Sequence, residues 1–191
     1  MIIGIDCDEV LAETLDTLFA TSHILRAYST TKAEITSYNP LQTIKNNIPQ
    51  ELGTQIFWGL FASDEYRTIQ PVLGAKEKLQ QRKTAGHELI LLTGRPLRFQ
   101  DRTEERIHQQ YPNLFSDFLF SSAYTDQEVP KSQLCQQKGI ELVVEDNLFF
   151  VQDLAAHHIP CFLLQQPRNR DYTPEQYPGV IKVNSRKEIP L

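Results

Sequence analysis

A chain of 191 residues, 40% of them hydrophobic and 23% charged, has the composition of one globular domain or of a core domain with a small insertion. Its formal net charge of −5, with no basic patch, excludes nucleic-acid polymers as partners. The sequence contains neither a signal peptide nor an apolar run of transmembrane length, so we expect a cytoplasmic protein with no membrane partner. Cys7, Cys135 and Cys161 are widely spaced, and we interpret them as reduced, structural thiols.

The first predicted element is a short buried strand that ends in two carboxylates. Ile2, Ile3 and Ile5 are apolar and β-branched, as is typical of a strand buried on both faces. The apolar run stops at Asp6, and Asp8 follows. Ligands of open α/β sheets bind just beyond the carboxyl ends of the strands. Two acids there are able to hold Mg²⁺, and one is able to attack phosphorus; the alternative is a surface turn with solvated acids.

Residues 12–75 show helical patterns and no clear strand. Apolar residues recur at helical spacing over 15–24, where Thr14 is a candidate N-cap, and again from Pro49 to Phe61. The stretch from about 27 to 54 between them is polar and irregular. We interpret residues 12–75 as a small helical cap that lies over the strand ends.

From residue 75 onwards, predicted strands alternate with predicted helices. The strands begin at about residues 88, 115, 140, 160 and 180, and the helices cover about 75–83, 100–109, 130–137 and 148–156. This alternation predicts an α/β fold with a Rossmann-like parallel sheet and helices on both faces. The expected division is a core domain of residues 1–11 and 76–191 and a cap of residues 12–75.

Strand ends and nearby loops carry polar groups that a doubly wound sheet brings to one crevice. In chain order these are Asp6 and Asp8, Thr93-Gly94-Arg95, Lys131, and Glu145-Asp146. Phosphoryl transfer needs a nucleophile, a metal ion that neutralises phosphate oxygens, and donors for the remaining oxygens. The four motifs together, in this order, are stronger evidence for phosphoryl transfer than any one of them alone.

The two acids of the first motif are the expected catalytic residues. Asp6 would attack phosphorus and become an aspartyl phosphate, while Asp8 would protonate the leaving alkoxide and then deprotonate the hydrolytic water. Mg²⁺ would lie between Asp6, the backbone carbonyl of Asp8 and Asp146, with Glu145 as a ligand or as a support for the ligands.

The phosphate itself would be held by Thr93, the N–H of Gly94 and Lys131. Lys131 would also reduce the repulsion between Asp6 and the incoming anion. Each group has an ordinary structural alternative: Thr93-Gly94 as a turn, Lys131 as a surface residue, and Glu145-Asp146 as a cap of the following helix.

These motifs resemble those of the haloacid dehalogenase-type phosphatases, in the same order and over the whole chain. They are Ile5-Asp-Cys-Asp-Glu-Val10, Leu92-Thr-Gly-Arg95, Lys131 and Val144-Glu-Asp146. Within that superfamily the chain resembles most closely the 5′(3′)-deoxyribonucleotidases and their bacterial relatives, the type C 5′-nucleotidases. The small cap, Pro71-Val-Leu-Gly-Ala75 and Leu163-Leu-Gln-Gln-Pro-Arg-Asn-Arg170 carry this closer resemblance. Glu9 departs from the superfamily, which usually has Gly there; its side chain would narrow the site or contact the cap.

The resemblance implies a Mg²⁺-dependent phosphomonoesterase whose substrate, a (deoxy)nucleoside 5′-monophosphate, binds between core and cap. The cap aromatics are Phe19, Tyr38, Phe57, Trp58, Phe61 and Tyr66. Trp58 lies off the apolar stripe and is the expected substrate contact. Arg95, Arg168 and Arg170 are candidates to reach phosphate or a neighbouring loop, although the default interpretation is that they are surface residues. Arg95 is also an expected substrate contact.

Other functions share these motifs. One is a phosphatase of a sugar phosphate or another small metabolite. Others, from a different class, are a signalling module that accepts a phosphoryl group without releasing it and an inactive binding protein. The polar stretch of residues 165–178 is either an active-site flap or a loose loop.

Overall fold

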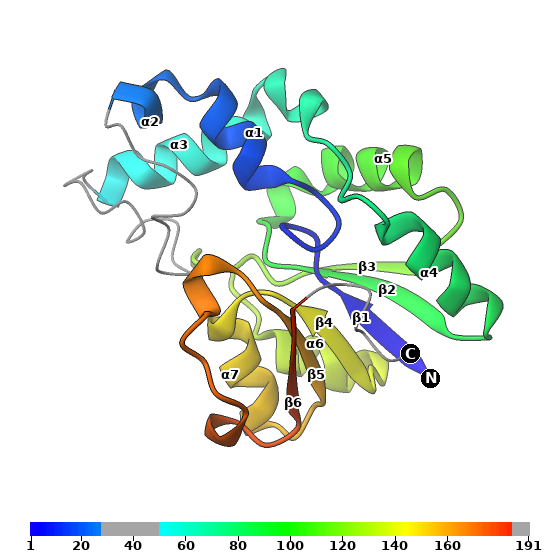
Figure 1. The fold of residues 1–191 in the computed structure, drawn as a ribbon. Coiled ribbons are helices and arrows are strands. Elements are labelled where there is room, and N and C mark those ends of the chain that lie inside the picture. The colour runs from blue at the N-terminus through cyan, green and yellow to red at the C-terminus, as the bar shows by residue number, and fades with distance from the viewer. Residues whose placement is uncertain (28–49, 185–191) are drawn as a thin grey trace.

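The computed structural model describes residues 1–27 and 50–184. Its centre is one sheet of six parallel strands in the order β3-β2-β1-β4-β5-β6 (Figure 1). The strands are β1 (Ile2–Ile5), β2 (Glu88–Thr93), β3 (Asp117–Phe120), β4 (Leu142–Glu145), β5 (Cys161–Leu164) and β6 (Val180–Val183). The predicted α/β fold with a Rossmann-like parallel sheet is confirmed, although β3 and β4 each begin two residues later than expected.

The order of the strands reverses between β1 and β4. Chain order runs outward from β1 to β3 in one direction and from β4 to β6 in the other, so β1 and β4 flank the switch point. Val144 O accepts a hydrogen bond from Asp6 N at 2.9 Å, which extends the pairing of the two strands by one residue. In open α/β sheets, ligands bind at such a switch point, just beyond the carboxyl ends of the strands.

Helices cover both faces of the sheet (Figure 1). They are α4 (Ala75–Thr84), α5 (Gln100–Gln110), α6 (Lys131–Lys138) and α7 (Leu148–Ala156). Side chains alternate along each strand, so Leu89 and Leu91 of β2 pack in the cluster that contains α4 and α5, while Ile90 and Leu92 pack in the cluster that contains α6 and α7. Strands buried on both faces explain the continuous apolar runs in the sequence.

The described residues between β1 and α4 form helices and no named strand. These helices are α1 (Thr14–Thr21), α2 (His23–Ala27), α3 (Gln50–Ala62) and the 3-10 turn η2 (Glu65–Thr68), and they lie beyond the carboxyl end of β1 (Figure 1). The two connections to the sheet run side by side, with Ala12 and Pro71 in an antiparallel bridge. The division into core and cap remains a prediction. Tyr38 lies outside the described residues.

One cluster of buried side chains joins these helices to the sheet. Leu15 and Leu18 of α1 and Phe61 of α3 belong to the same cluster as Ile3 and Ile5 of β1. All three cysteines are buried and unpaired, as expected for structural thiols. Within the described ranges no helix combines the length and the apolarity needed to cross a membrane.

Candidate active site

Three buried carboxylates meet at the switch point. Asp6 directly follows β1, Glu145 is the last residue of β4, and Asp146 follows it. One oxygen of each lies within 4.8 Å of the others. Burial and the neighbouring charge of Glu145 raise the pKa of Asp6 to about 7, against the opposing effect of Lys131. Three clustered carboxylates with a perturbed pKa have the character of a cation site.

Lys131 joins the two strands at this point. Its Nζ donates to Asp6 Oδ1 and to Glu145 Oε1, both at 2.6 Å, and it lies 4.2 Å from the centre of the Phe150 ring. The side chain is only 1% exposed. Burial alone would lower the pKa of Lys131, but the charges of Asp6 and Glu145 outweigh it and raise that pKa above its ordinary value. Lys131 is therefore a buried ammonium ion, not a surface residue.

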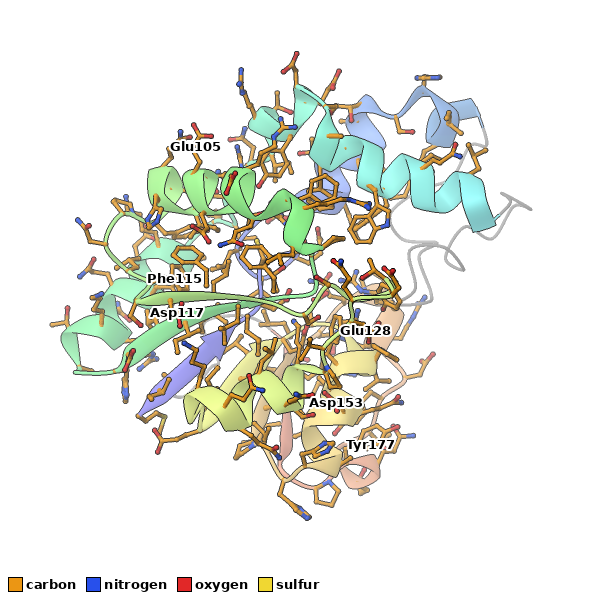
Figure 2. All side chains as sticks on the ribbon, turned by 180° about the vertical axis from the view of Figure 1, so that it is seen from behind. Glu105, Phe115, Asp117, Glu128, Asp153 and Tyr177 are labelled. Atoms are coloured by element: carbon orange, nitrogen blue, oxygen red, sulfur yellow. The ribbon has the colours of Figure 1, made fainter. Side chains whose placement is uncertain are left out.

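The start of α6 is held in place by a neighbouring helix. Asp153 of α7 accepts hydrogen bonds from Ser132 N at 2.9 Å and from Ser132 Oγ at 2.7 Å. Figure 2, seen from behind, places Asp153 beside α6. The first turn of α6 is thus anchored one residue beyond Lys131, which orients the ammonium toward Asp6.

Glu145 and Asp6 differ in how many of their carboxylate oxygens accept hydrogen bonds. Glu145 Oε1 accepts from Lys131, and its Oε2 accepts from Asp146 N at 2.6 Å and Asn147 N at 2.9 Å. In contrast, Asp6 Oδ2 accepts no hydrogen bond from the part of the chain that is described. One oxygen of Asp6 is therefore available to react, whereas both oxygens of Glu145 hold neighbouring groups in place.

The loop after β5 reaches the acidic cluster. Asn169, at the end of η4 (Pro167–Asn169), donates from Nδ2 to Asp146 O at 2.9 Å and to Leu164 O at 2.7 Å. Arg168 forms an ion pair with Asp146 Oδ2, and its side chain is 8% exposed. The expectation that Arg168 is a surface residue is therefore wrong, because Asn169 ties the loop down beside Asp146.

The donor set fits a hard divalent cation. Asp6, Glu145 and Asp146 offer only carboxylate oxygens, which are the ligands that Mg²⁺ prefers. They carry three formal negative charges, and the described cations in contact with them are Lys131 and Arg168. The Asp8 carboxylate is not part of this group, and a ligand role for the Asp8 backbone carbonyl stays a prediction.

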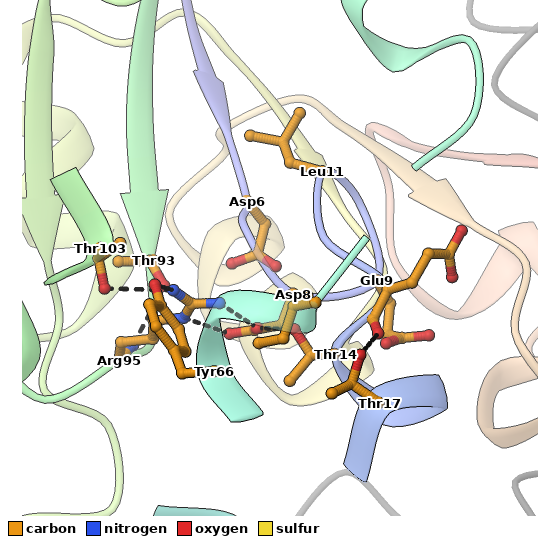
Figure 3. Close-up of polar contacts among 12 residues, drawn as sticks. Asp6, Asp8, Glu9, Leu11, Thr14, Thr17, Tyr66, Thr93, Arg95 and Thr103 are labelled. Atoms are coloured by element: carbon orange, nitrogen blue, oxygen red, sulfur yellow. Dashed lines mark hydrogen bonds and ion pairs between the residues drawn. The ribbon is translucent and has the colours of Figure 1, made fainter. Parts of the chain in front are cut away.

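The Asp8 carboxylate points toward Arg95 (Figure 3). Arg95 Nε donates to Asp8 Oδ2 at 3.0 Å and Arg95 Nη2 donates to Asp8 Oδ1 at 2.7 Å. The Thr14 hydroxyl also donates to Asp8 Oδ1. Burial would raise the pKa of Asp8, but Arg95 and the hydrogen bonds of Arg95 and Thr14 hold that pKa below its ordinary value. The default assignment of Arg95 to the surface is wrong, since Arg95 is 2% exposed.

The Thr93-Gly94 turn leaves no room for a larger residue. A Cβ atom at Gly94 would lie 2.9 Å from Phe150 Cζ, and Phe150 in turn packs on Lys131. Thr93 is fully buried, and its Oγ1 accepts a hydrogen bond from Arg95 N at 3.2 Å. Phe150 therefore packs against both the turn and the ammonium of Lys131, and a phosphate-binding role for the turn stays a prediction.

The side chain of Glu9 contacts the start of the predicted cap, which is one of the two roles expected for it. Its φ of 62° lies in the left-handed region, which explains why Gly is usual at this position. Its Oε1 accepts a hydrogen bond from Leu15 N at 2.8 Å, so the side chain caps the start of α1. Thr14, the expected N-cap, is instead the first residue of α1 and donates its hydroxyl to Asp8.

Trp58 lies where α3 meets the loop after β2. Its ring centroid is 6.1 Å from that of Phe99, in η3 (Leu97–Phe99), and 5.1 Å from that of Phe57. The side chain is half-buried, so part of it is accessible. A substrate contact through Trp58 stays a prediction.

No family model matches the sequence, and no curated protein matches it. Solved structures do resemble this chain. A haloacid dehalogenase-like family hydrolase from Streptococcus pneumoniae is 11% identical, with a TM-score of 0.60 over 86% of this chain and 84% of that chain. A putative phosphoglycolate phosphatase from Lactobacillus delbrueckii subsp. bulgaricus is 13% identical, with a TM-score of 0.67 over 96% and 93%. CbbY from Rhodobacter sphaeroides, bound to xylulose-(1,5)bisphosphate, is 16% identical, with a TM-score of 0.56 over 94% and 92%. At these identities the likeness shows a shared fold.

Proposed function

We propose that this chain is a haloacid dehalogenase-like phosphatase: a Mg²⁺-dependent phosphomonoesterase that works through an aspartyl phosphate on Asp6. The observation that carries the proposal is the buried contact of Asp6 with Lys131 beside Glu145 and Asp146, at the switch point of the sheet. Strongly perturbed titratable groups that converge at such a point are typical of catalytic sites.

Asp6 is the nucleophile of the proposed reaction. Its Oδ2 forms a bond to phosphorus while the bond from phosphorus to the leaving oxygen breaks. Lys131, Thr93 and the N–H of Gly94 hold the phosphate oxygens. Asp6, Asp146 and the Asp8 carbonyl would hold Mg²⁺, which would neutralise negative charge on the phosphate when bound.

Asp8 moves the protons in both half-reactions. It gives a proton to the leaving alkoxide, then takes one from the water that attacks the aspartyl phosphate and releases phosphate. Paired with Arg95, Asp8 is ionised, which is the form that accepts a proton. The negative charge of a bound phosphate raises the pKa of a neighbouring carboxyl group and so favours the form that donates one.

The proposed substrate is a (deoxy)nucleoside 5′-monophosphate that binds between a core of residues 1–11 and 76–191 and a cap of residues 12–75. The resemblance to deoxyribonucleotidases supports it, with the half-buried Trp58 ring as a stacking surface. The second candidate is a sugar phosphate or another small metabolite. Structures of the same fold include a putative phosphoglycolate phosphatase and a complex with xylulose-(1,5)bisphosphate. The unpaired, buried cysteines support a cytoplasmic location.

The test is phosphate release from a panel of deoxy- and ribonucleoside monophosphates, sugar phosphates and p-nitrophenyl phosphate. It is run with Mg²⁺, with a chelator, and with Asp6→Asn. Metal-dependent turnover that peaks on dUMP or dTMP and disappears in Asp6→Asn supports the proposal. Turnover that peaks on a sugar phosphate keeps the mechanism and selects the second candidate. Stable phosphorylation without release identifies a phosphoryl-accepting module instead.

A further inference from the structure

We propose that Arg95 is the positioning residue for Asp8, and that it links the Asp8 carboxylate to the cap through the hydroxyl group of Tyr66. This inference rests on the proposed function, because it assigns Arg95 a role in the proton transfers of that reaction. It replaces the expected role of Arg95 as a substrate contact.

Arg95 and Asp8 form a bidentate salt bridge. Nε and Nη2 of the guanidinium donate to different oxygens of the same carboxylate, at 3.0 and 2.7 Å. Two parallel hydrogen bonds fix the plane of the carboxylate as well as its position. The side chain of Asp8 is 25% exposed while that of Arg95 is 1% exposed, so Arg95 is the buried anchor and Asp8 the accessible group.

The Nη1 group of Arg95, which does not contact Asp8, binds residues of both the predicted cap and the core. Arg95 Nη1 donates to the Tyr66 hydroxyl at 2.9 Å and to Thr103 Oγ1 of α5 at 3.2 Å. Its Cζ also lies 4.5 Å from the centre of the Phe61 ring. Phe61 of α3 and Tyr66 of η2 belong to the predicted cap, so Arg95 connects Asp8 to the cap through the Tyr66 hydroxyl group.

These contacts leave Arg95 little capacity for a ligand. Its four hydrogen bonds use four of the five N–H groups of a guanidinium. Of its acceptors only Asp8 has a place in the reaction. Arg95 therefore acts on the substrate through Asp8, and not by direct contact.

The experiment compares two esters that differ in their need for a proton donor. An alkyl phosphate, dUMP (or glucose 6-phosphate if the panel favours sugars), releases a basic alkoxide that must be protonated. p-Nitrophenyl phosphate releases a stable phenolate that needs little help. Because kcat/KM reports the transfer of the phosphoryl group from the ester, the ratio of the two values isolates proton donation by Asp8.

Arg95→Met should lower kcat/KM for the alkyl ester at least about tenfold more than for the aryl ester, since general acid catalysis contributes about 10²–10⁴-fold. Arg95→Lys should give a ratio between those of the wild type and Arg95→Met, because an ammonium group keeps the charge but cannot form the bidentate contact. Tyr66→Phe, which keeps the ring and removes the hydroxyl, should move the ratio in the same direction by a smaller factor.

Arg102→Met is the matched control. Arg102 packs on the same Tyr66 ring at 5.1 Å and donates to Ser63 O at 2.7 Å, but it does not contact Asp8. It should leave the ratio unchanged, whatever it does to stability. Unfolding in urea supplies a second readout: the effects of Asp8→Asn and Arg95→Met should be non-additive in the double variant.

The outcomes separate this inference from the proposed function. If the wild type hydrolyses neither ester, the proposed function is wrong and the inference falls with it. If the wild type hydrolyses both and Arg95→Met lowers both by the same factor, or favours the alkyl ester, only the inference is wrong. A ratio that Arg102→Met shifts as much as Arg95→Met also overturns it.

Discussion

One lysine compensates two carboxylates from different strands. Lys131 Nζ is 2.6 Å from both Asp6 and Glu145, and all three side chains are buried. A buried carboxylate without a partner is costly, so Lys131 makes the burial of Asp6 tolerable. The remaining oxygen of Asp6 is the one that we propose attacks phosphorus.

Replacement of the Asp6 carboxylate by an amide should abolish turnover. We expect Asp6→Asn to lower kcat at least about a thousand-fold, as is usual when a covalent nucleophile is lost. The amide is similar in size and still accepts a hydrogen bond from Lys131, so the fold should persist. Phosphate release and circular dichroism of the same preparation measure the two effects. A folded Asp6→Asn variant with wild-type turnover would rule out the aspartyl phosphate.

Glu9 combines an unfavourable backbone conformation with a useful hydrogen bond. Glu9→Ala should destabilise the protein by about 1 kcal/mol, because Ala loses the cap of α1 and keeps the left-handed φ. Glu9→Gly should be more stable than Glu9→Ala by about 1 kcal/mol, because Gly adopts this φ without strain. Glu9→Gln, which keeps an acceptor for Leu15 N, is the control. Urea unfolding measures all three, and equal stability of the Ala and Gly variants would contradict this account.

At the scale of elements, the site depends on helices and loops that fix one another. α7 supplies Asp153, which holds the start of α6, and Phe150, which packs between Gly94 and Lys131. The loop after β5 is held in place at the carboxyl-terminal end of η4. Asn169 bonds to the backbone at Asp146, and Lys182 of β6 donates to Arg170 O at 2.7 Å. Within the stretch of residues 165–178, it is therefore η4 that is attached to the site.

Gly94→Ala tests the packing between the β2 turn and α7. The new methyl group would press on the Phe150 ring at 2.9 Å, so we expect a loss of about 1–3 kcal/mol in the free energy of unfolding. The displaced ring should also disturb Lys131 and lower activity. In Gly94→Ala/Phe150→Leu the smaller side chain should restore part of the stability. If the second substitution adds to the loss instead, the steric explanation is wrong.

At the scale of the whole molecule, the strand order brings the acidic cluster together. β1 and β4 are far apart in the chain but adjacent in the sheet, so folding places Asp6 beside Glu145 and Asp146. The folded chain carries a site that the unfolded chain lacks, and a ligand of that site should stabilise the fold.

Mg²⁺ should therefore raise the melting temperature. At a hundred times its Kd, a ligand specific to the folded state contributes about 2.7 kcal/mol. Asp146→Asn should greatly reduce the shift. Asp117→Asn is the control, because Asp117 is the first residue of the edge strand β3 (Figure 2) and pairs with Lys138, whereas the cluster lies at the carboxyl ends of β1 and β4. Differential scanning calorimetry with and without Mg²⁺ measures the shift; an equal shift in both variants would place the cation elsewhere.

Most of the fold followed from local patterns. Apolar runs predicted the strands, and helical periodicity predicted α7 over residues 148–156 and α4 to within a residue. The chain order of the motifs also indicated which residues meet, because parallel strands end at a common edge. Errors of one or two residues occurred at strand starts, where hydrogen bonding to the neighbouring strand decides the boundary.

The sequence by itself determined the α/β class and the order of the strands along the chain, and it predicted which polar residues follow the strand ends, since periodicity and turn residues are local properties. Only the tertiary structure decided how the charges pair. Arg95 lies 87 positions from Asp8, and Arg168 reaches Asp146 from a loop beyond the next strand. A buried charge must find a partner, but which partner depends on elements that meet in space. Burial and charge compensation turned two expected surface arginines into parts of the site.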